Sequence, residues 1–372
     1  MAWTEKRKLI NQNQSGFRKR HSTQDNIFKI VETCKIGIQN GQKAGIVLFD
    51  IEKAFDKAPH NNILTQLSKY RCPLNIGKWL TEFLNNRSFF VKIDEAESSK
   101  KSITAGVPQG SPLSPILFSL LINEIGKVLD KFNINYALFA DDLTIWKIHS
   151  RKDAIQKALQ QASTAINKFF LKIGLKINEK KCLYSTFSNK RSALNLEILI
   201  NNAPIQYTPN PCVLGVILDK KLNFREHFDD ITRKLSSKIN LLKILSYKSS
   251  GVNIYYLLTI YKSLILSKIQ YGMIPFLISC NKTKSNLQTI QNKCLKIILN
   301  VPRNTNTEFL HSSLKIDKLE DRLKVLTTNY LKKAFTSNSS INSLIEYYQP
   351  ADNQPNSDSR IKKSILNMIK IN

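Results

Sequence analysis

Two short acidic signatures, 91 positions apart, constrain this chain more than any other feature. Asp50 closes the apolar run AGIVLFD, and the pair Asp141–Asp142 lies inside YALFADDLTIW. An unpaired ionised carboxylate in apolar, strand-like surroundings is costly. Carboxylates that converge from separate strands are stabilised by divalent cations, and two such ions about 3.5–4 Å apart are a common device for phosphoryl transfer. The signatures together predict a shared metal site, whereas the pair in isolation is read more simply as an acidic turn.

A glycine-rich loop lies between the two signatures. The segment GVPQGSPLSPILFSLL at 106–121 runs into an apolar helix, for which Ser111 is a suitable N-cap and Pro112 a suitable first residue. Apolar side chains then recur at helical spacing as far as Val128. The order carboxylate, glycine loop, carboxylate pair favours a nucleic-acid polymerase.

The charge balance favours a polyanionic partner. The chain of 372 residues carries 56 Lys and Arg against 28 Asp and Glu, a formal net charge of +28. Lysines and arginines bind a phosphate backbone through the release of its counterions. An AT-biased genome would explain abundant lysine, but it would not by itself hold the acidic residues to half the basic count. An anionic membrane surface is the other candidate, but no matching helix stands out.

The six cysteines predict no disulfide framework and no zinc site, because none forms a CxxC pair and no histidine has zinc-finger spacing. The first residues contain no apolar signal core. The longest apolar stretch, near 113–122, is about ten residues and falls short of the ~20 needed to cross a bilayer. We therefore expect a soluble, intracellular protein without a membrane partner.

The pattern of elements predicts an α+β first part and an all-helical second part. A capped helix follows Ser22–Thr23, a buried strand covers 44–50, and two strands, 136–140 and 143–148, form a hairpin with the aspartates at its strained tip. The other expected elements are a helix from Ile63, an exposed hairpin over 88–105, a helix over 151–173 capped by Gly174, a hairpin around Asn201–Asn202 and a strand over 213–219. From about 225 to 335 the spacing is helical throughout, with lysine and arginine on the polar faces.

Taken together, these segments resemble the reverse transcriptase of non-LTR retrotransposons, most closely the Jockey-like, insect-type elements. The segments that carry the resemblance are QSGFRKRHST (14–23), VLFDIEKAFDKAPHNNIL (47–64), GVPQGSPLSPILFSLLINEI (106–125), YALFADD (136–142), LKINEKKC (175–182) and LGVILD (214–219). Each motif alone is weak, but six in the family's order leave little room for coincidence.

The resemblance implies an RNA-directed DNA polymerase that adds deoxynucleotides to a primer 3′-hydroxyl, with RNA as template and a DNA primer or target DNA as partner. It implies a right-hand polymerase fold: a palm of antiparallel sheet and packed helices, partial fingers, and a basic helical thumb. The implied domains are fingers and palm at 1–219, thumb or connection at 220–345 and a flexible tail at 346–372. It also implies that the protein is made in the cytoplasm and carries out target-primed copying in the nucleus.

The resemblance assigns roles residue by residue. Two Mg²⁺ ions, with Mn²⁺ as an alternative, would be held by Asp50, Asp141 and Asp142. Lys181, or Lys180 beside it, would protonate the leaving pyrophosphate. The implied nucleotide-binding residues are Arg18 on the triphosphate, the aromatic Phe55 that rejects a 2′-hydroxyl, and the loop residues Gly106, Gln109 and Gly110. The implied primer grip is Leu214, Gly215 and Val216.

The departures from the family pattern leave other functions open. Phe139 and Cys182 stand where tyrosine and threonine are usual, and only thirteen residues precede QSGFR. On this ground we expect an N-terminally truncated copy. A catalytically impaired nucleic-acid-binding remnant that lacks complete fingers is the alternative to an active polymerase. A group II intron maturase shares the palm but fits 214–335 less well, and a metal-dependent nuclease would not need the glycine loop. Nothing in the sequence indicates the oligomeric state.

Overall fold

The chain divides into two compact units in a computed structural model that describes residues 2–189, 194–247 and 250–337 together with 341, 342, 344 and 365. The first unit lies within Met1–Ile30, Gln42–Thr186 and Lys190–Thr208, and the second within Val31–Gly41, Phe187–Asn189 and Pro209–Asn372. The tail expected at 346–372 lies outside the described residues except for Ile365. The domain boundary expected near 219 stays a prediction.

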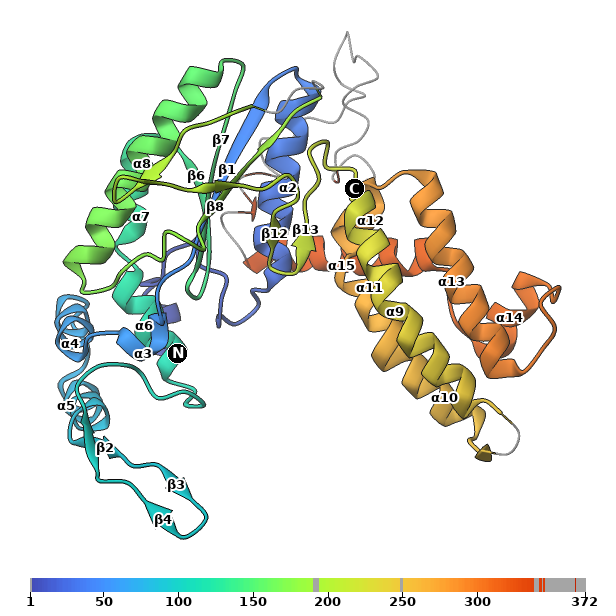
Figure 1. The fold of residues 1–372 in the computed structure, drawn as a ribbon, viewed down its shortest axis with the longest axis horizontal. Helices are drawn as coiled ribbons and strands as arrows, with labels where there is room; N and C mark the ends of the chain where they lie inside the picture. Colours follow the sequence, from blue (N-terminus) through green and yellow to red (C-terminus); the bar gives the residue numbers. More distant parts are fainter. Residues whose placement is uncertain are drawn as a thin grey trace. The chain divides into compact units, whose positions relative to one another are not determined.

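The first unit mixes helices and strands (Figure 1). Its elements are α1 (Ala2–Lys6), the start of α2 (Thr23–Gln39), β1 (Lys43–Phe49), α3 (Ala54–Lys57), α4 (His60–Lys69), α5 (Leu74–Leu84), β2 (Arg87–Phe89), β3 (Lys92–Ile93), β4 (Ala96–Glu97), β5 (Lys101–Ile103), α6 (Ser114–Ile122), α7 (Ile125–Leu129), a 3₁₀ turn (Asp130–Phe132), β6 (Asn135–Phe139), β7 (Asp142–His149), α8 (Lys152–Lys172), β8 (Leu183–Phe187), β9 (Leu199–Ile200), β10 (Ala203–Pro204) and β11 (Gln206–Tyr207). The expected α+β architecture is confirmed.

A five-stranded sheet with the order β11-β8-β1-β7-β6 forms the centre of this unit. Strand β7 pairs antiparallel with both β1 and β6, as predicted for a palm sheet. At the other edge the sheet differs from the prediction, because β11 runs parallel to β8. The β9–β10 hairpin lies between these two strands in the chain. Strand β11 then pairs with Leu183 and Tyr184, the first two residues of β8.

Helix α8 packs on β1 and β7. The contact is close at Gly45, where a Cβ atom would lie 2.6 Å from Ile155 and 2.9 Å from Leu159 of the helix. The central strand β1 is largely buried, and Ile46 and Val47 are both inaccessible to solvent. This explains why β1 is a continuous apolar run that ends at Asp50.

The long helix expected from Ser111 to Val128 is two helices instead. Helix α6 begins at Ser114, and α7 follows after a break at Asn123–Glu124. The side chain of Asn123 is drawn into other contacts: Nδ2 donates to Leu9 O (2.7 Å) and Tyr70 Oη (2.8 Å), and Oδ1 accepts from Asn11 N (2.6 Å). These partners come from distant parts of the chain, so spacing alone could not reveal the break.

The second unit is mainly helical, as predicted. Its elements are β12 (Cys212–Val213), β13 (Val216–Ile217), α9 (Arg225–Leu245), α10 (Ile254–Ile260), a π-helical turn (Tyr261–Leu266), α11 (Ser267–Tyr271), α12 (Met273–Ile278), α13 (Asn281–Leu299), α14 (Thr307–Leu314) and α15 (Leu319–Ser337). Helix α13 packs against α9, α14 and α15. None of the helices in the described part of the chain is both long and apolar enough to span a membrane.

The prediction of a single strand over 213–219 is wrong, because this segment contains the turn and one strand of a β-hairpin. Val213 pairs with Val216, and the two residues between them have positive φ angles, 46° at Leu214 and 80° at Gly215. Positive φ at both central positions is the geometry of a tight hairpin turn. The glycine inside the apolar run marked this turn.

Candidate active site

The structure brings the three aspartates to one end of the central sheet. In the β1–β7 ladder Phe49 pairs with Leu143, so Asp50 and Asp142 follow at the next position of each strand. Asp142 also pairs with Phe139 across the β6–β7 hairpin, and Ala140–Asp141 form its two-residue turn. The expected hairpin is confirmed, with Asp141 in the turn and Asp142 as the first residue of β7.

The three carboxylates repel one another. Burial raises the pKa of Asp141, and the charge of Asp50 raises it further. Burial likewise raises the pKa of Asp142, with additions from Asp141 and then Asp50. Within the described ranges, no lysine, arginine or histidine forms an ion pair with any of the three.

The donor set fits divalent cations in kind, because hard cations prefer carboxylate oxygen. The side chains do not yet form a closed set of ligands: the described part of the chain holds no group of three or more His, Cys, Asp or Glu placed to hold a metal ion. The sheet register brings the three backbones together, and joint coordination of a metal ion by their side chains stays a prediction.

The loop that carries Lys181 is fastened to the backbone of Asp50. Asn178 N donates to Asp50 O (2.8 Å), and Asp50 N donates to Cys182 Sγ (3.5 Å). Cys182 is fully buried, and its burial raises the thiol pKa to about 11. Lys180 and Lys181 are both exposed on this turn. The structure thus gives Cys182 a contact with Asp50 that the sequence interpretation did not foresee.

Backbone hydrogen bonds connect the glycine loop to the segment that contains Phe55. Gly106 N donates to Ala58 O and Val107 N to Phe55 O, both at 2.8 Å. The buried His60 donates from Nε2 to Gly106 O (2.7 Å). A Cβ atom at Gly106 would lie 2.6 Å from the backbone oxygen of Asp56, so this close approach requires glycine.

Gln109 of this loop contacts the turn that follows Phe55. Gln109 Nε2 donates to Asp56 Oδ1 (2.8 Å), and Gly110 has a φ of 87°. The half-buried ring of Phe55 stacks on Phe118 of α6 with centroids 4.8 Å apart. The glycine loop and the aromatic residue thus form one assembly, although 51 positions separate Phe55 from Gly106.

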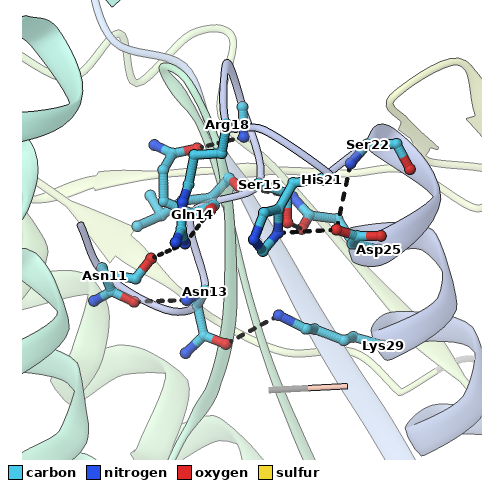
Figure 2. A network of polar contacts seen from close by, with 12 residues as sticks. Asn11, Asn13, Gln14, Ser15, Arg18, His21, Ser22, Asp25 and Lys29 are labelled. Atoms are coloured by element: carbon cyan, nitrogen blue, oxygen red, sulfur yellow. Dashed lines mark hydrogen bonds and ion pairs between the residues drawn. The ribbon is translucent and has the colours of Figure 1, made fainter. Parts of the chain in front are cut away.

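The guanidinium of Arg18 already has hydrogen-bond partners within the protein (Figure 2). Its guanidinium donates from Nε and Nη2 to the two carboxylate oxygens of Glu5 (3.0 and 2.9 Å). Nη1 donates to the backbone oxygens of Asn11 (3.1 Å) and Gln14 (3.2 Å). The hydrogen bond from Arg18 lowers the pKa of Glu5, against the effect of burial. A contact between Arg18 and a triphosphate would have to replace some of these partners.

The hairpin that contains Leu214, Gly215 and Val216 belongs to the second unit. Tyr271 of α11 donates from Oη to Leu214 O (2.5 Å), and its ring lies 3.4 Å from the position of a Cβ atom at Gly215. The predicted primer grip is therefore a tight turn supported by a tyrosine from the helical part of its own unit.

Sequence reasoning assigned no role to Gln14 and His60, which contact the site's backbone directly. Gln14 bonds both backbone polar groups of Ala140, beside Asp141. Gln14 and His60 lie inside quoted motifs, but only the fold reveals their partners.

Comparison with known proteins gives a consistent result. The family model described as "Reverse transcriptase (RNA-dependent DNA polymerase)" matches residues 2–218. The chain is 27% identical over 331 residues to the RNA-directed DNA polymerase from mobile element jockey of Drosophila melanogaster, covering 88% of this chain and 36% of that protein. It is 24% identical over 334 residues to the probable RNA-directed DNA polymerase from transposon BS of the same organism, covering 87% and 36%. The chain thus spans about a third of the length of these relatives.

Among solved structures, apo telomerase from Candida tropicalis aligns with 92% of this chain and 59% of its own, at 14% identity and a TM-score of 0.44. A TM-score at this level is too low to support a conclusion about fold or function.

Proposed function

Because the chain belongs to the reverse transcriptase (RNA-dependent DNA polymerase) family, we propose that it is an RNA-directed DNA polymerase of a non-LTR retrotransposon. Its substrates are deoxynucleoside triphosphates and a DNA primer or nicked target DNA, and its template is RNA. The observation that carries the proposal is the convergence of Asp50, Asp141 and Asp142 at one end of the sheet, without a cationic partner among the described residues. The net charge of +28 suits a nucleic-acid partner.

Divalent-metal dependence is a general property of the family. For this chain we propose two Mg²⁺ ions, with Mn²⁺ as an alternative, held by Asp50, Asp141 and Asp142. When bound, the ions lower the pKa of the primer 3′-hydroxyl and neutralise charge on the triphosphate. Burial and then mutual repulsion raise the pKa values of Asp141 and Asp142, and this supports the role because a bound cation would offset the repulsion.

The other residues of the site orient the substrates. The stacked ring of Phe55 closes the space that a ribose 2′-hydroxyl would need, and the loop of Gly106, Gln109 and Gly110 lies against nucleotide and template. Lys181, or the adjacent Lys180, gives a proton to the leaving pyrophosphate. Arg18 binds the triphosphate after exchange of its Glu5 partner, and Leu214–Val216 hold the primer. Target-primed copying places this activity in the nucleus.

Primer extension on an RNA template with Mg²⁺ tests the proposal. Asp141→Ala and Asp142→Ala are each expected to abolish extension, because either change removes a metal ligand. Asp153→Ala is the matched control, since Asp153 lies exposed in the first turn of α8. Extension that persists in both site variants contradicts the assigned site. A wild-type protein that binds RNA but extends no primer is instead the impaired remnant.

The aromatic residue has a separate test. Phe55→Val is expected to reduce discrimination against ribonucleotides by at least about tenfold, because a smaller side chain leaves space beside the sugar. The measurement is the ratio of kcat/KM for a deoxynucleotide and its ribonucleotide. Phe169→Val is the control, because Phe169 of α8 is likewise partly buried against the same core. An unchanged ratio in Phe55→Val would make Phe55 a packing residue only.

A further inference from the structure

The turn that carries Asp141 has a strained backbone. Ala140 and Asp141 are the only residues between β6 and β7, and Ala140 has a φ of 55°. This left-handed conformation is unfavourable for a residue other than glycine. Such residues persist where the surrounding structure determines their conformation.

The side-chain amide of Gln14 supplies that determination. Its Oε1 accepts from Ala140 N (3.0 Å), and its Nε2 donates to Ala140 O (3.3 Å). Both backbone polar groups of the strained residue are therefore bound by one side chain. Gln14 is 1% exposed, so water does not compete for these hydrogen bonds.

Gly16 supports the same turn from its backbone. Gly16 N donates to Gln14 Oε1 (2.9 Å), which holds the amide in its orientation. A Cβ atom at Gly16 would lie 2.4 Å from Ala140 N. No side chain fits between these two backbones, which explains the glycine of the QSG segment in physical terms.

The segment that carries Gln14 is itself fixed to the edge strand β6. Leu138 N donates to Asn13 O and Ser15 N donates to Leu138 O, both at 2.9 Å. Asn26, at the start of α2, donates from Nδ2 to Leu138 O and accepts from Ser15 Oγ, again at 2.9 Å. Figure 2 shows Asn13, Gln14 and Ser15 within the polar network that ties this segment down. The backbone that carries the Gln14 side chain is thus fixed to β6 and α2 by several hydrogen bonds.

We infer that Gln14 is a positioning residue of the polymerase site. Its amide fixes the Ala140–Asp141 turn and thereby sets where the Asp141 carboxylate lies relative to Asp50. The inference rests on the proposed function, because only that function requires the Asp141 carboxylate to bind a metal ion. Gln14 does not itself touch the reacting groups.

The first test is Gln14→Met, which keeps the length of the side chain and removes both hydrogen bonds to Ala140. Loss of a group that orients a metal ligand typically costs about 10–100-fold in metal affinity or activity. We expect the Mg²⁺ concentration for half-maximal extension to rise at least about tenfold, with the KM for primer–template unchanged. Gln66→Met is the control: Gln66 of α4 is 7% exposed, and among the described residues its Oε1 has no partner.

Two readouts do not need catalysis. In the metal-free protein, hydrogen exchange at the Ala140 amide is expected to accelerate in Gln14→Met and to stay unchanged in Gln66→Met. The rise in unfolding temperature on adding Mg²⁺ is expected to need a higher Mg²⁺ concentration in Gln14→Met. A wild-type protein that extends no primer contradicts the proposed function, while these two measurements still report whether Gln14 positions the turn.

Ala140→Gly separates positioning from simple stabilisation, because glycine adopts a positive φ without strain. In the double variant Gln14→Met/Ala140→Gly, the unfolding temperature is expected to recover while the raised Mg²⁺ requirement persists. Recovery of the wild-type Mg²⁺ requirement would overturn the inference, since Gln14 would then serve only to offset strain. A wild-type Mg²⁺ requirement in Gln14→Met, or a wild-type protein whose unfolding does not respond to Mg²⁺, would overturn it equally.

Discussion

In the network of Figure 2 each charged side chain has a polar partner, whereas Asp50, Asp141 and Asp142, at one end of the central sheet, form no ion pair with a cation among the described residues. Arg18 pairs with Glu5, and His21 Nδ1 lies 3.1 Å from Asp25 Oδ2. Lys29 Nζ donates to Asn13 Oδ1 (3.2 Å). Both clusters belong to the first unit, and Gln14, next to Asn13 of the network, bonds to the backbone of Ala140 beside Asp141.

The difference separates charged residues that have partners within the fold from carboxylates that have none among the described residues, and the latter are the proposed metal ligands. A buried charge with a well-placed partner is satisfied within the protein. Carboxylates that only repel one another lose free energy on folding, and a bound cation recovers it. This contrast supports the proposed role of the aspartates as metal ligands, while the contacts of Arg18 anchor the segment that carries Gln14.

The largest effect is expected from Asp50→Asn. Asparagine keeps the size of the side chain but lacks the charge that holds a cation, so the rate of extension should fall by about 10³-fold or more, a loss of the size seen for key transition-state contacts. In the metal-free protein the same change should leave the unfolding temperature equal or higher, because repulsion is relieved. A lower metal-free stability would mean that Asp50 is a structural residue, and the contrast between the clusters would fail.

Mg²⁺ itself should stabilise the folded protein. At an ion concentration about one hundred times the dissociation constant, a ligand that binds only the folded state adds about 2.7 kcal/mol to the free energy of unfolding. Thermal unfolding with and without Mg²⁺ measures this, with NaCl at matched ionic strength as the control for general screening. Asp142→Asn should reduce the Mg²⁺ effect, whereas Asp153→Asn on α8 should not. An equal response in both variants would place the ion elsewhere.

The sequence allowed prediction of those parts that local patterns determine. The helices α2 and α8, the Asn201–Asn202 turn and the aspartate hairpin follow from apolar spacing, caps and turn residues near the predicted positions. The sequence predicted that Asp50 and the 141–142 pair share one site; the antiparallel pairing brings the end of β1 beside the start of β7, and the role of the aspartates as metal ligands stays a prediction.

The rest depends on partners that are distant in the chain. Asn123 lies at the break between two helices and contacts Leu9 and Asn11. Strand β11 runs parallel to β8 because the chain passes through the β9–β10 hairpin between them. Arg18 was predicted to bind a triphosphate, but no local signal shows that Glu5 already occupies its guanidinium. Single-sequence patterns contain no information about which side chain finds which backbone across more than a hundred positions.

A moderate effect on stability is expected at Lys29. Burial lowers the pKa of Lys29 from 10.5 to about 8, with Asp25 acting in the opposite direction. Because the folded pKa is the lower one, the unfolded chain binds more protons between these values, and wild-type stability should rise as pH increases from about 8 to 10.5. Lys29→Met should lack this rise, with a difference on the order of 2 kcal/mol at pH 7 in favour of the variant. Urea unfolding at pH 7 and 10 measures it, and a parallel pH dependence of the two proteins would contradict the burial argument.

The smallest effect is expected from Glu5→Gln, which keeps the size of the side chain facing Arg18 but removes the charge and one of the two acceptor oxygens. Part of Glu5 is exposed, its side chain being 29% accessible, so solvent screens the pair and the loss should be about 1 kcal/mol. If Arg18 must leave Glu5 to bind a triphosphate, the same variant should lower the KM for deoxynucleotides, because the competing partner is weaker. Steady-state kinetics with Glu52→Gln as control distinguishes the two roles, since Glu52 pairs with Lys57 at the surface. A KM that stays constant while stability falls would make Arg18 an anchor alone and would sharpen the contrast between the paired network and the unpaired aspartates.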